Sequence, residues 1–81
     1  MEPEAIKSLL TIGFTDANID VEVEGSHVQL LIVSDEFEGL NTLKRQQKVY
    51  GLLAEQIASG VIHAVNMKTQ TNIEYNASPT F

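Results

Sequence analysis

The clearest pattern along the chain is a strict alternation of apolar and acidic residues. From Ile19 to Glu24 every second residue is apolar, and each residue between them is acidic. A strand places successive side chains on opposite faces, so this alternation predicts a half-buried β-strand. Gly25 and Ser26 form a two-residue loop that suits a type II′ turn, and residues 27–33 form the predicted returning strand. The segment therefore predicts a β-hairpin.

The length of this loop also predicts the register of the hairpin. A two-residue loop leaves one pairing of the strands, and the predicted partners are Glu24 with His27, Val23 with Val28, Val21 with Leu30, and Ile19 with Ile32. Every pair on one face is then apolar, whereas the other face carries the acids and His27. We therefore expect the apolar face to pack against helices and the acidic face to lie in solvent.

Two segments show the spacing of amphipathic helices. Residues 3–12 carry an apolar stripe that begins just after a proline-suited first turn. Residues 38–60 return to a helical spacing, and Gly39 and Asn41 favour a turn or a short helix before a main helix over residues 45–58. The predicted buried face of this second segment consists of Leu43, Tyr50, Leu53 and Ile57, widened by Val49 and Leu52.

The last third of the chain predicts a third strand over residues 62–69 and a final helical turn over residues 73–75. The order of elements is α+β. The long helical connection between the second and third strands favours a parallel, right-handed placement of the third strand, which gives a three-stranded mixed sheet with helices on one face. The predicted core consists of Ile6, Leu9, Leu10, Ile19, Val21, Val23, Val28, Leu30, Ile32, Tyr50, Leu53, Ile57, Val65 and Met67.

The composition supports one small core. Of the 81 residues 43% are hydrophobic, and 5 basic against 11 acidic side chains give a formal net charge of −6. A mean hydropathy of −0.02 is too apolar for a disordered acidic tail, and no apolar run approaches the roughly 20 residues that cross a bilayer. The acidic start is unlike a basic secretory leader. We expect a cytoplasmic protein with one domain over residues 1–76 and a flexible tail over residues 77–81.

The residue types also exclude several kinds of chemistry. The chain has no Cys, which excludes disulfides, thiol catalysis and iron–sulfur sites built from its own thiolates. It has no nucleophile elbow and no Gly-rich or Walker nucleotide motif. The acids Asp35, Glu36 and Glu38 fit a solvated loop after a strand. We therefore expect the protein not to be an enzyme.

Positive charge is concentrated at one place, where Lys44, Arg45 and Lys48 fall within five positions. Such a cluster can contact nucleic-acid phosphates, although the net charge of −6 repels a polynucleotide at long range. A solvated helix face is the simpler interpretation of the same residues.

His27 and His63 are the only conventional nitrogen ligands for a soft metal. Two ligands cannot complete a tetrahedral site. Each histidine also has a structural interpretation, because His27 can contact Glu24 across the hairpin and His63 can form a hydrogen bond at the opening of its strand.

The order and spacing of several motifs resemble a known family. The motifs are Ser26-His27, Val33-Ser34-Asp35-Glu36-Phe37-Glu38-Gly39, Arg45-Gln46-Gln47-Lys48-Val49-Tyr50 and Ile62-His63-Ala64-Val65. Together they resemble the BolA family, whose pattern is approximately V-S-x-x-F-x-G, then R-H-x-x-V-Y, then a strand-opening H-A. The run from Lys44 to Gly51 is most similar to the IbaG (YrbA) branch. The resemblance covers nearly the whole chain.

This resemblance implies a class II KH-like fold of order α-β-β-α-α-β-α. It also implies a non-enzymatic partner of monothiol glutaredoxins that shares a two-iron, two-sulfide (2Fe-2S) cluster with the glutaredoxin and glutathione, in cluster trafficking or iron homeostasis. His63 occupies the family's cluster-ligand position. The second ligand of the family comes from the loop between the first two strands, where His27 is the nearby nitrogen candidate. The family's terminal acid–Trp pair corresponds to Glu74 and Tyr75, which we expect to be structural.

Some members of the family are described as transcription regulators linked to stress. The resemblance therefore also implies an alternative function, a small KH-like nucleic-acid-binding regulator that uses Lys44, Arg45 and Lys48. A third hypothesis is an interaction module without metal. The sequence leaves open whether the free chain is a monomer or a homodimer.

Overall fold

Helices and strands follow one another in the order that the sequence predicts. The computed structural model describes residues 1–77. Its elements are α1 (Pro3–Gly13), β1 (Asn18–Glu24), β2 (His27–Val33), the 3₁₀ turn η1 (Asp35–Phe37), α2 (Thr42–Leu52), α3 (Ala54–Ala58), β3 (Ala64–Gln70) and α4 (Asn72–Ala77). None of the helices within residues 1–77 has the length and hydropathy of a membrane-spanning segment.

The three strands form one mixed sheet in the order β1-β2-β3. β1 and β2 are antiparallel, with Glu24 opposite His27 and Val21 opposite Leu30, so the predicted register is confirmed. Gly25 has a φ of 61°, the positive value that a type II′ turn requires at its first central position. β3 lies parallel to β2, as the helical connection predicts.

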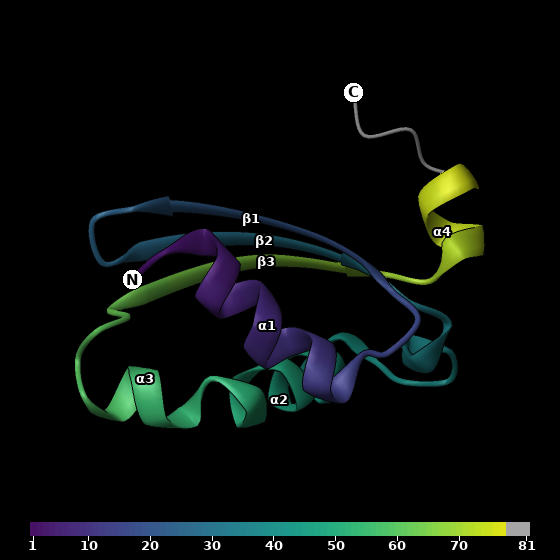
Figure 1. Cartoon of the computed structure of the whole chain (residues 1–81). Helices are drawn as coiled ribbons and strands as arrows, with labels where there is room; N and C mark the ends of the chain where they lie inside the picture. The colour runs from purple at the N-terminus through teal and green to yellow at the C-terminus, as the bar shows by residue number, and fades with distance from the viewer. Residues whose placement is uncertain (78–81) are drawn as a thin grey trace.

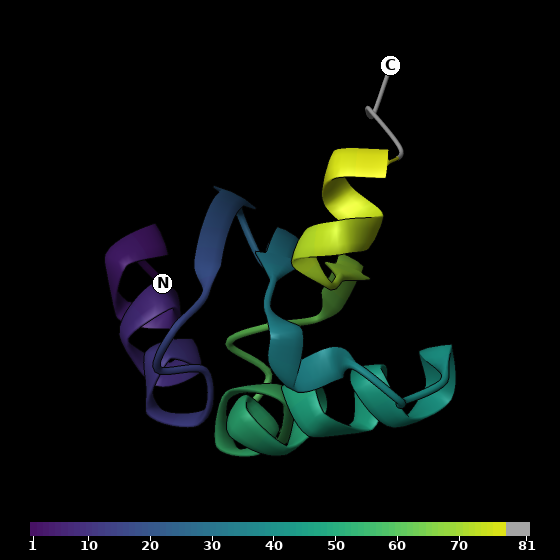
Figure 2. The ribbon, with the colours of Figure 1, turned by 90° about the vertical axis from the view of Figure 1, so that its right-hand side faces the viewer.

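The helices form a layer on one face of the sheet. Figures 1 and 2 show α2 and α3 beneath the strands, and Figure 2 shows α1 beside β1 at the edge of the same layer. α4 is the exception, because it leaves the far end of β3 and rises on the opposite side of the sheet (Figure 2). The expectation of helices on one face therefore holds for the first three helices and is wrong for α4.

The core lies between the sheet and these three helices. Its buried residues include half of the predicted ones, together with Phe14, Phe37, Val49 and Ile62. Five further predicted residues are partly buried and pack against this core: Leu9, Val21, Val23, Val65 and Met67. Phe14 and Phe37 pack with ring centroids 5.0 Å apart at 55°. Two predicted core residues are wrong, because Tyr50 is 40% exposed and Ile57 is 37% exposed. Val49 of α2 and the following Leu53 are buried, so Leu53 is confirmed, whereas Leu43, also expected on the buried face, is 61% exposed.

The boundaries of the second helical segment differ from the prediction. α2 starts at Thr42 rather than at Arg45, because the Oδ1 atom of Asn41 accepts a hydrogen bond from the Lys44 amide at 2.9 Å and caps the helix. Leu53, with φ −109° and ψ 10°, interrupts the helix. The turn predicted before the main helix is present at Glu38 and Gly39, and a further short helix, α3, follows the main helix.

The elements of the C-terminal part of the chain agree more closely with the prediction. β3 begins at Ala64, two residues later than predicted, because the Ile62 amide donates to the Gln56 carbonyl at 3.1 Å and holds that residue to the helical layer. The predicted final helical turn is present as α4. The tail expected over residues 77–81 lies, apart from Ala77, outside the described residues.

α4 is attached to the body by an ion pair between Arg45 and Glu74. The guanidinium Nη1 and Nη2 atoms donate to the two carboxylate oxygens at 2.6 and 3.1 Å. Arg45 also donates to the carbonyls of Leu40 and Thr69, at 2.9 and 3.2 Å, and its guanidinium carbon lies 5.7 Å from the Phe37 ring centroid. One side chain thus joins α2, β3, η1 and α4.

The first turn of α4 is a capping box. The Glu74 amide donates to the hydroxyl of Thr71 at 3.2 Å, and the Glu74 carboxylate accepts from the Thr71 amide at 2.9 Å. Hydrogen bonds from Arg45 and from the Thr71 backbone lower the pKa of Glu74 to about 2. The structural role expected for Glu74 is confirmed, and its signal in the sequence is the T-x-x-E spacing.

The hairpin register predicts opposite responses from two neighbouring residues of β2. Val28 is buried, whereas Gln29 is exposed and lies opposite Glu22. Val28→Lys places an unpaired charge in the core, and we expect a loss of about 3 kcal/mol or more in the free energy of unfolding. Gln29→Lys should change stability by less than about 1 kcal/mol. Urea denaturation of both variants measures the difference, and equal losses would contradict the assignment of faces.

The Arg45–Glu74 pair predicts a stability that depends on acid pH. The ordinary pKa of the Glu74 carboxyl is 4.5, and the folded protein lowers it to about 2. The stabilisation is therefore complete above pH 4.5 and is lost as the pH falls toward 2. Between pH 4.5 and 2 the free energy of unfolding should fall less in Glu74→Gln than in the wild type. In Glu55→Gln, a control on an exposed acid, it should fall as much as in the wild type. Denaturation curves at stepped pH values test this prediction. An identical dependence of the free energy of unfolding on pH in wild type and Glu74→Gln would refute it.

Candidate functional site

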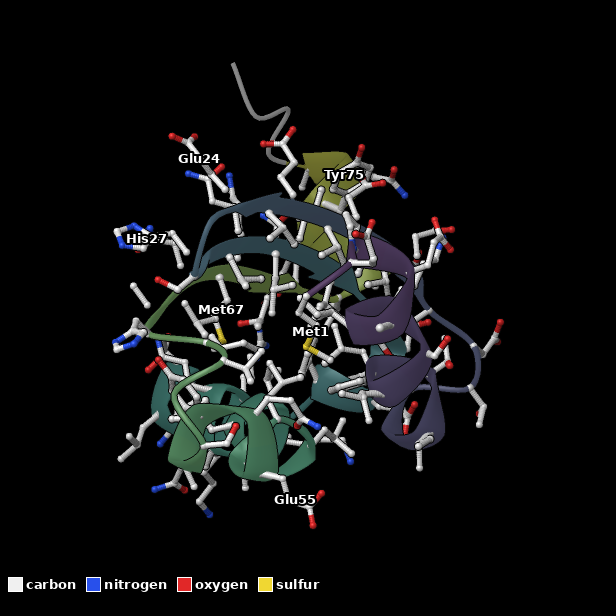
Figure 3. All side chains as sticks on the ribbon, turned by 60° about the vertical axis from the view of Figure 1, so that its left-hand side comes forward. Met1, Glu24, His27, Glu55, Met67 and Tyr75 are labelled. Atoms are coloured by element: carbon white, nitrogen blue, oxygen red, sulfur yellow. The ribbon has the colours of Figure 1, made fainter. Side chains whose placement is uncertain are left out.

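The two histidines lie at the same end of the sheet. His27 opens β2 directly after the hairpin turn, and its register partner in β3 is Ala64. The His63 amide donates to the Ser26 carbonyl at 2.9 Å, so the residue just before β3 is held to the turn. Figure 3 shows His27 at this hairpin end, pointing away from the body. The fold therefore brings together the two residues that the sequence singled out as ligands.

Their imidazole rings, however, belong to opposite faces of the sheet. His27 alternates with the buried Val28, so it lies on the outer face, in an open depression of about 520 Å³ that it lines with Glu22, Val23, Glu24, Gln29 and Asn66. The Nε2 atom of His63 lies 3.8 Å from the position of a β-carbon on Gly60. Gly60 follows α3, so the ring of His63 lies on the side of the helical layer.

Both imidazoles are accessible. His27 and His63 are exposed, and within residues 1–77 neither ring has a hydrogen bond or an ion pair with another side chain. The expected contact between His27 and Glu24 is present as a register pair but not as an ion pair. The hydrogen bond expected of His63 is made by its backbone amide and leaves the ring free.

The donor set at this end of the sheet is incomplete for a metal held by this chain alone. No group of three or more His, Asp or Glu side chains within residues 1–77 is arranged to hold a metal ion. The chain also has no Cys to supply thiolates. What the site offers is one accessible imidazole on each face, which fits a centre whose other ligands come from a second molecule.

The basic cluster is divided between two roles. The side chain of Arg45 is only 12% exposed, and its guanidinium is used by Glu74 and by two carbonyls. Lys44 and Lys48 remain exposed, and the Nζ atom of Lys48 lies 5.4 Å from the Phe14 ring centroid. Most of the N–H donors of Arg45 are therefore used within the fold, and contact of this residue with phosphate stays a prediction. Two lysines on an acidic chain are a weak basis for nucleic-acid binding.

Known proteins resemble this chain over most of its length. The acid stress protein IbaG of Escherichia coli strain K12 is 40% identical over 75 residues, which cover 93% of this chain and 89% of the relative. An uncharacterized protein in the rpoN-murA intergenic region of Acinetobacter guillouiae is 36% identical over 81 residues, covering 100% of this chain and 98% of the relative. The expected similarity to the IbaG branch is confirmed.

Solved structures share the fold. BolA1 from Arabidopsis thaliana superimposes with a TM-score of 0.80 at 28% identity, covering 91% of this chain and 98% of that one. A bolA protein homologue from Coxiella burnetii gives a TM-score of 0.80 at 30% identity, covering 94% of this chain and 97% of that one. The predicted BolA-like α+β fold is confirmed.

The family model for BolA, described as BolA-like protein, matches residues 14–74. This span contains both strands of the hairpin, the two histidines, the basic cluster and the ion pair between Arg45 and Glu74. Because the match covers most of the chain and agrees with the fold, the chain belongs to the BolA family.

Proposed function

We propose that this protein is a non-enzymatic partner of a monothiol glutaredoxin, and that the two proteins share a 2Fe-2S cluster for which His63 is a ligand. The observation that carries the proposal is the exposed side chain of His63, whose backbone amide is bonded to the Ser26 carbonyl at the hairpin turn. The family membership supports it, because the chain has the histidine at the family's ligand position. The role is the holding and transfer of iron–sulfur clusters in the cytoplasm.

The backbone around His63 suits a ligand that meets a metal from outside. The bond from the His63 amide to the Ser26 carbonyl fixes the residue relative to the hairpin. Gly60 has a φ of 82°, which favours glycine, and its missing side chain leaves space next to Nε2. The backbone of His63 is therefore fixed, and the Nε2 atom, which would bind iron, has space beside it.

The remaining ligands have to come from elsewhere. Iron in such clusters is bound by thiolates, and this chain has no Cys. A glutaredoxin cysteine and glutathione supply the thiolates in this proposal. When bound, a cluster with a histidine ligand has a higher reduction potential than one with thiolates alone. This chain's contribution is to place and orient one imidazole.

His27 is the less suitable of the two histidines as a second ligand. An iron–nitrogen bond is about 2 Å long, and His27 and His63 project from opposite faces of the sheet. We therefore assign the ligand role to His63 and expect His27 to remain outside the cluster.

A stress setting for this function is suggested by one relative. The Escherichia coli protein that is 40% identical is named an acid stress protein. We extend that setting to this chain as part of the proposal, because of the 40% identity between the two proteins. The alternative, a nucleic-acid-binding regulator, loses support from the structural use of Arg45.

The two histidines provide a matched pair of variants that test the proposal. Wild-type protein co-expressed with a monothiol glutaredoxin should give a heterocomplex that contains iron and absorbs visible light. His63→Ala should alter the visible spectrum and lower the iron content, because it removes a ligand but little packing. His27→Ala should leave both close to wild type. Circular dichroism checks that both variants are folded.

Three results would contradict parts of this assignment. Equal losses from both variants would make His27 a ligand as well. An unchanged spectrum and iron content with His63→Ala would remove the assignment of His63. A stable heterocomplex without iron would favour the third hypothesis, an interaction module without metal.

A further inference from the structure

The two edges of the sheet differ in how they are protected. The strand order makes β1 one edge and β3 the other. β1 carries the acids Asp20, Glu22 and Glu24, and α1 lies beside it (Figure 2). β3 is seven residues long, contains no Pro and carries one charge, on Lys68. Edge strands that stay unpaired are usually blunted by charges, Pro or a covering element. β3 therefore has the properties of an edge that accepts another strand.

The backbone groups of Val65 and Met67 point away from the sheet. The Gln70 carbonyl accepts from the Ser34 amide at 2.8 Å, so Gln70 directs its backbone groups toward β2. The N–H and C=O groups of successive residues in a strand alternate in direction. Val65 and Met67, at the intervening positions, therefore direct their groups outward. Within residues 1–77 these four groups have no hydrogen-bond partner.

The open edge of β3 is limited at both ends. The Thr69 carbonyl already accepts from Nη1 of Arg45 at 3.2 Å, and the His63 amide donates to the Ser26 carbonyl. The open edge therefore covers residues 64–68, a length of about 17 Å in an extended strand. Its donors and acceptors recur at every second residue, which is the spacing that an extended polypeptide matches. The chemistry of the edge thus selects a short peptide backbone as its occupant.

The space beside the open edge suits one strand rather than a second folded copy. Figure 2 shows α2 extending beneath β3 and beyond it, with no other described element beside β3 at the level of the sheet. An added strand would lie about 4.8 Å from β3, above this part of α2. Two copies paired through β3 in one sheet would have both helical layers on the same face. Each α2 would then extend into the space of the other.

The charges on the outer face of the sheet favour an acidic occupant. Lys68 is exposed on this face and forms no ion pair within residues 1–77. The acids of β1 would lie three strand spacings from an added strand, which is about 14 Å. This distance exceeds the Debye length of about 8 Å at physiological ionic strength. An acidic side chain opposite Lys68 is therefore attracted by it and only weakly repelled by β1.

We propose that the open edge of β3 binds an extended acidic segment of a partner protein as a fourth strand. The segment pairs with the backbone groups of Val65 and Met67, and one of its acids lies opposite Lys68. Its other face is apolar, because Val65 and Met67 pack against the core on that side of the sheet. The proposal does not depend on the cluster function, since it uses no atom of the His63 side chain.

Hydrogen exchange of single amides, measured by NMR on the full chain, tests whether the edge is open. In the free protein the amides of Val65 and Met67 should exchange about tenfold or more faster than those of Asn66 and Lys68, which pair with β2. Equal rates at all four amides would overturn the proposal, because the edge would already be covered. A dependence of these rates on protein concentration would identify a second copy as the cover.

Two peptides of about seven residues with blocked ends test the chemistry of the occupant. One alternates Glu with Val, and the other alternates Lys with Val. The Glu peptide should slow exchange at the Val65 and Met67 amides, and it should bind about threefold or more tightly than the Lys peptide. Lys68→Glu should reverse this order. Lys7→Glu, a control with the same change of charge at an exposed position on α1, should keep it.

Two results of the peptide experiment would overturn the proposal. Unchanged exchange at Val65 and Met67 in millimolar Glu peptide would show that the edge does not accept a strand. An order of affinities that Lys68→Glu leaves unchanged would remove the acidic occupant. Circular dichroism verifies that the variants are folded, which we expect because both substituted positions are exposed.

Discussion

The two-residue turn at Gly25 and Ser26 is the constraint on which the rest of the structure depends. Because it allows one register, it places the apolar residues of β1, together with Val28, Leu30 and Ile32 of β2, on the face that meets the helices. A shift by one residue would exchange the buried and acidic faces. The same turn presents the Ser26 carbonyl that accepts the His63 amide, so the position of β3 and of the candidate ligand follows from it.

In α2, two side chains have a different role from the one that their residue type suggests. Arg45 belongs to the chain's basic cluster, yet its guanidinium binds Glu74 and two carbonyls and lies over Phe37. Tyr50, in turn, is apolar enough to be predicted in the core, yet it is exposed. Both outcomes follow from the rotation of one helix about its axis. Val49 of α2 and Leu53, which follows it, face the core, and that rotation leaves Leu43 and Tyr50 exposed.

In the proposed function, the candidate site is one part of a larger centre. A chain without Cys, with two accessible imidazoles on opposite faces, has donor atoms but no arrangement that closes around a metal. A fixed backbone at His63 and an open ring nitrogen favour a ligand that completes a partner's site. In this proposal, the small core has to hold only the hairpin end of the sheet in place.

The sequence by itself determined the hairpin, its register, the α+β order and the family, because periodicity and turn geometry are local properties of the chain. It also pointed to both histidines. Only the tertiary structure decided which way α2 turns, that Arg45 serves the fold, and that His27 and His63 project from opposite faces. These features depend on contacts between residues far apart in the chain, such as Arg45 with Glu74 and Ser26 with His63. A local pattern cannot contain them, because packing of the whole core selects among helix rotations that suit the same sequence equally well.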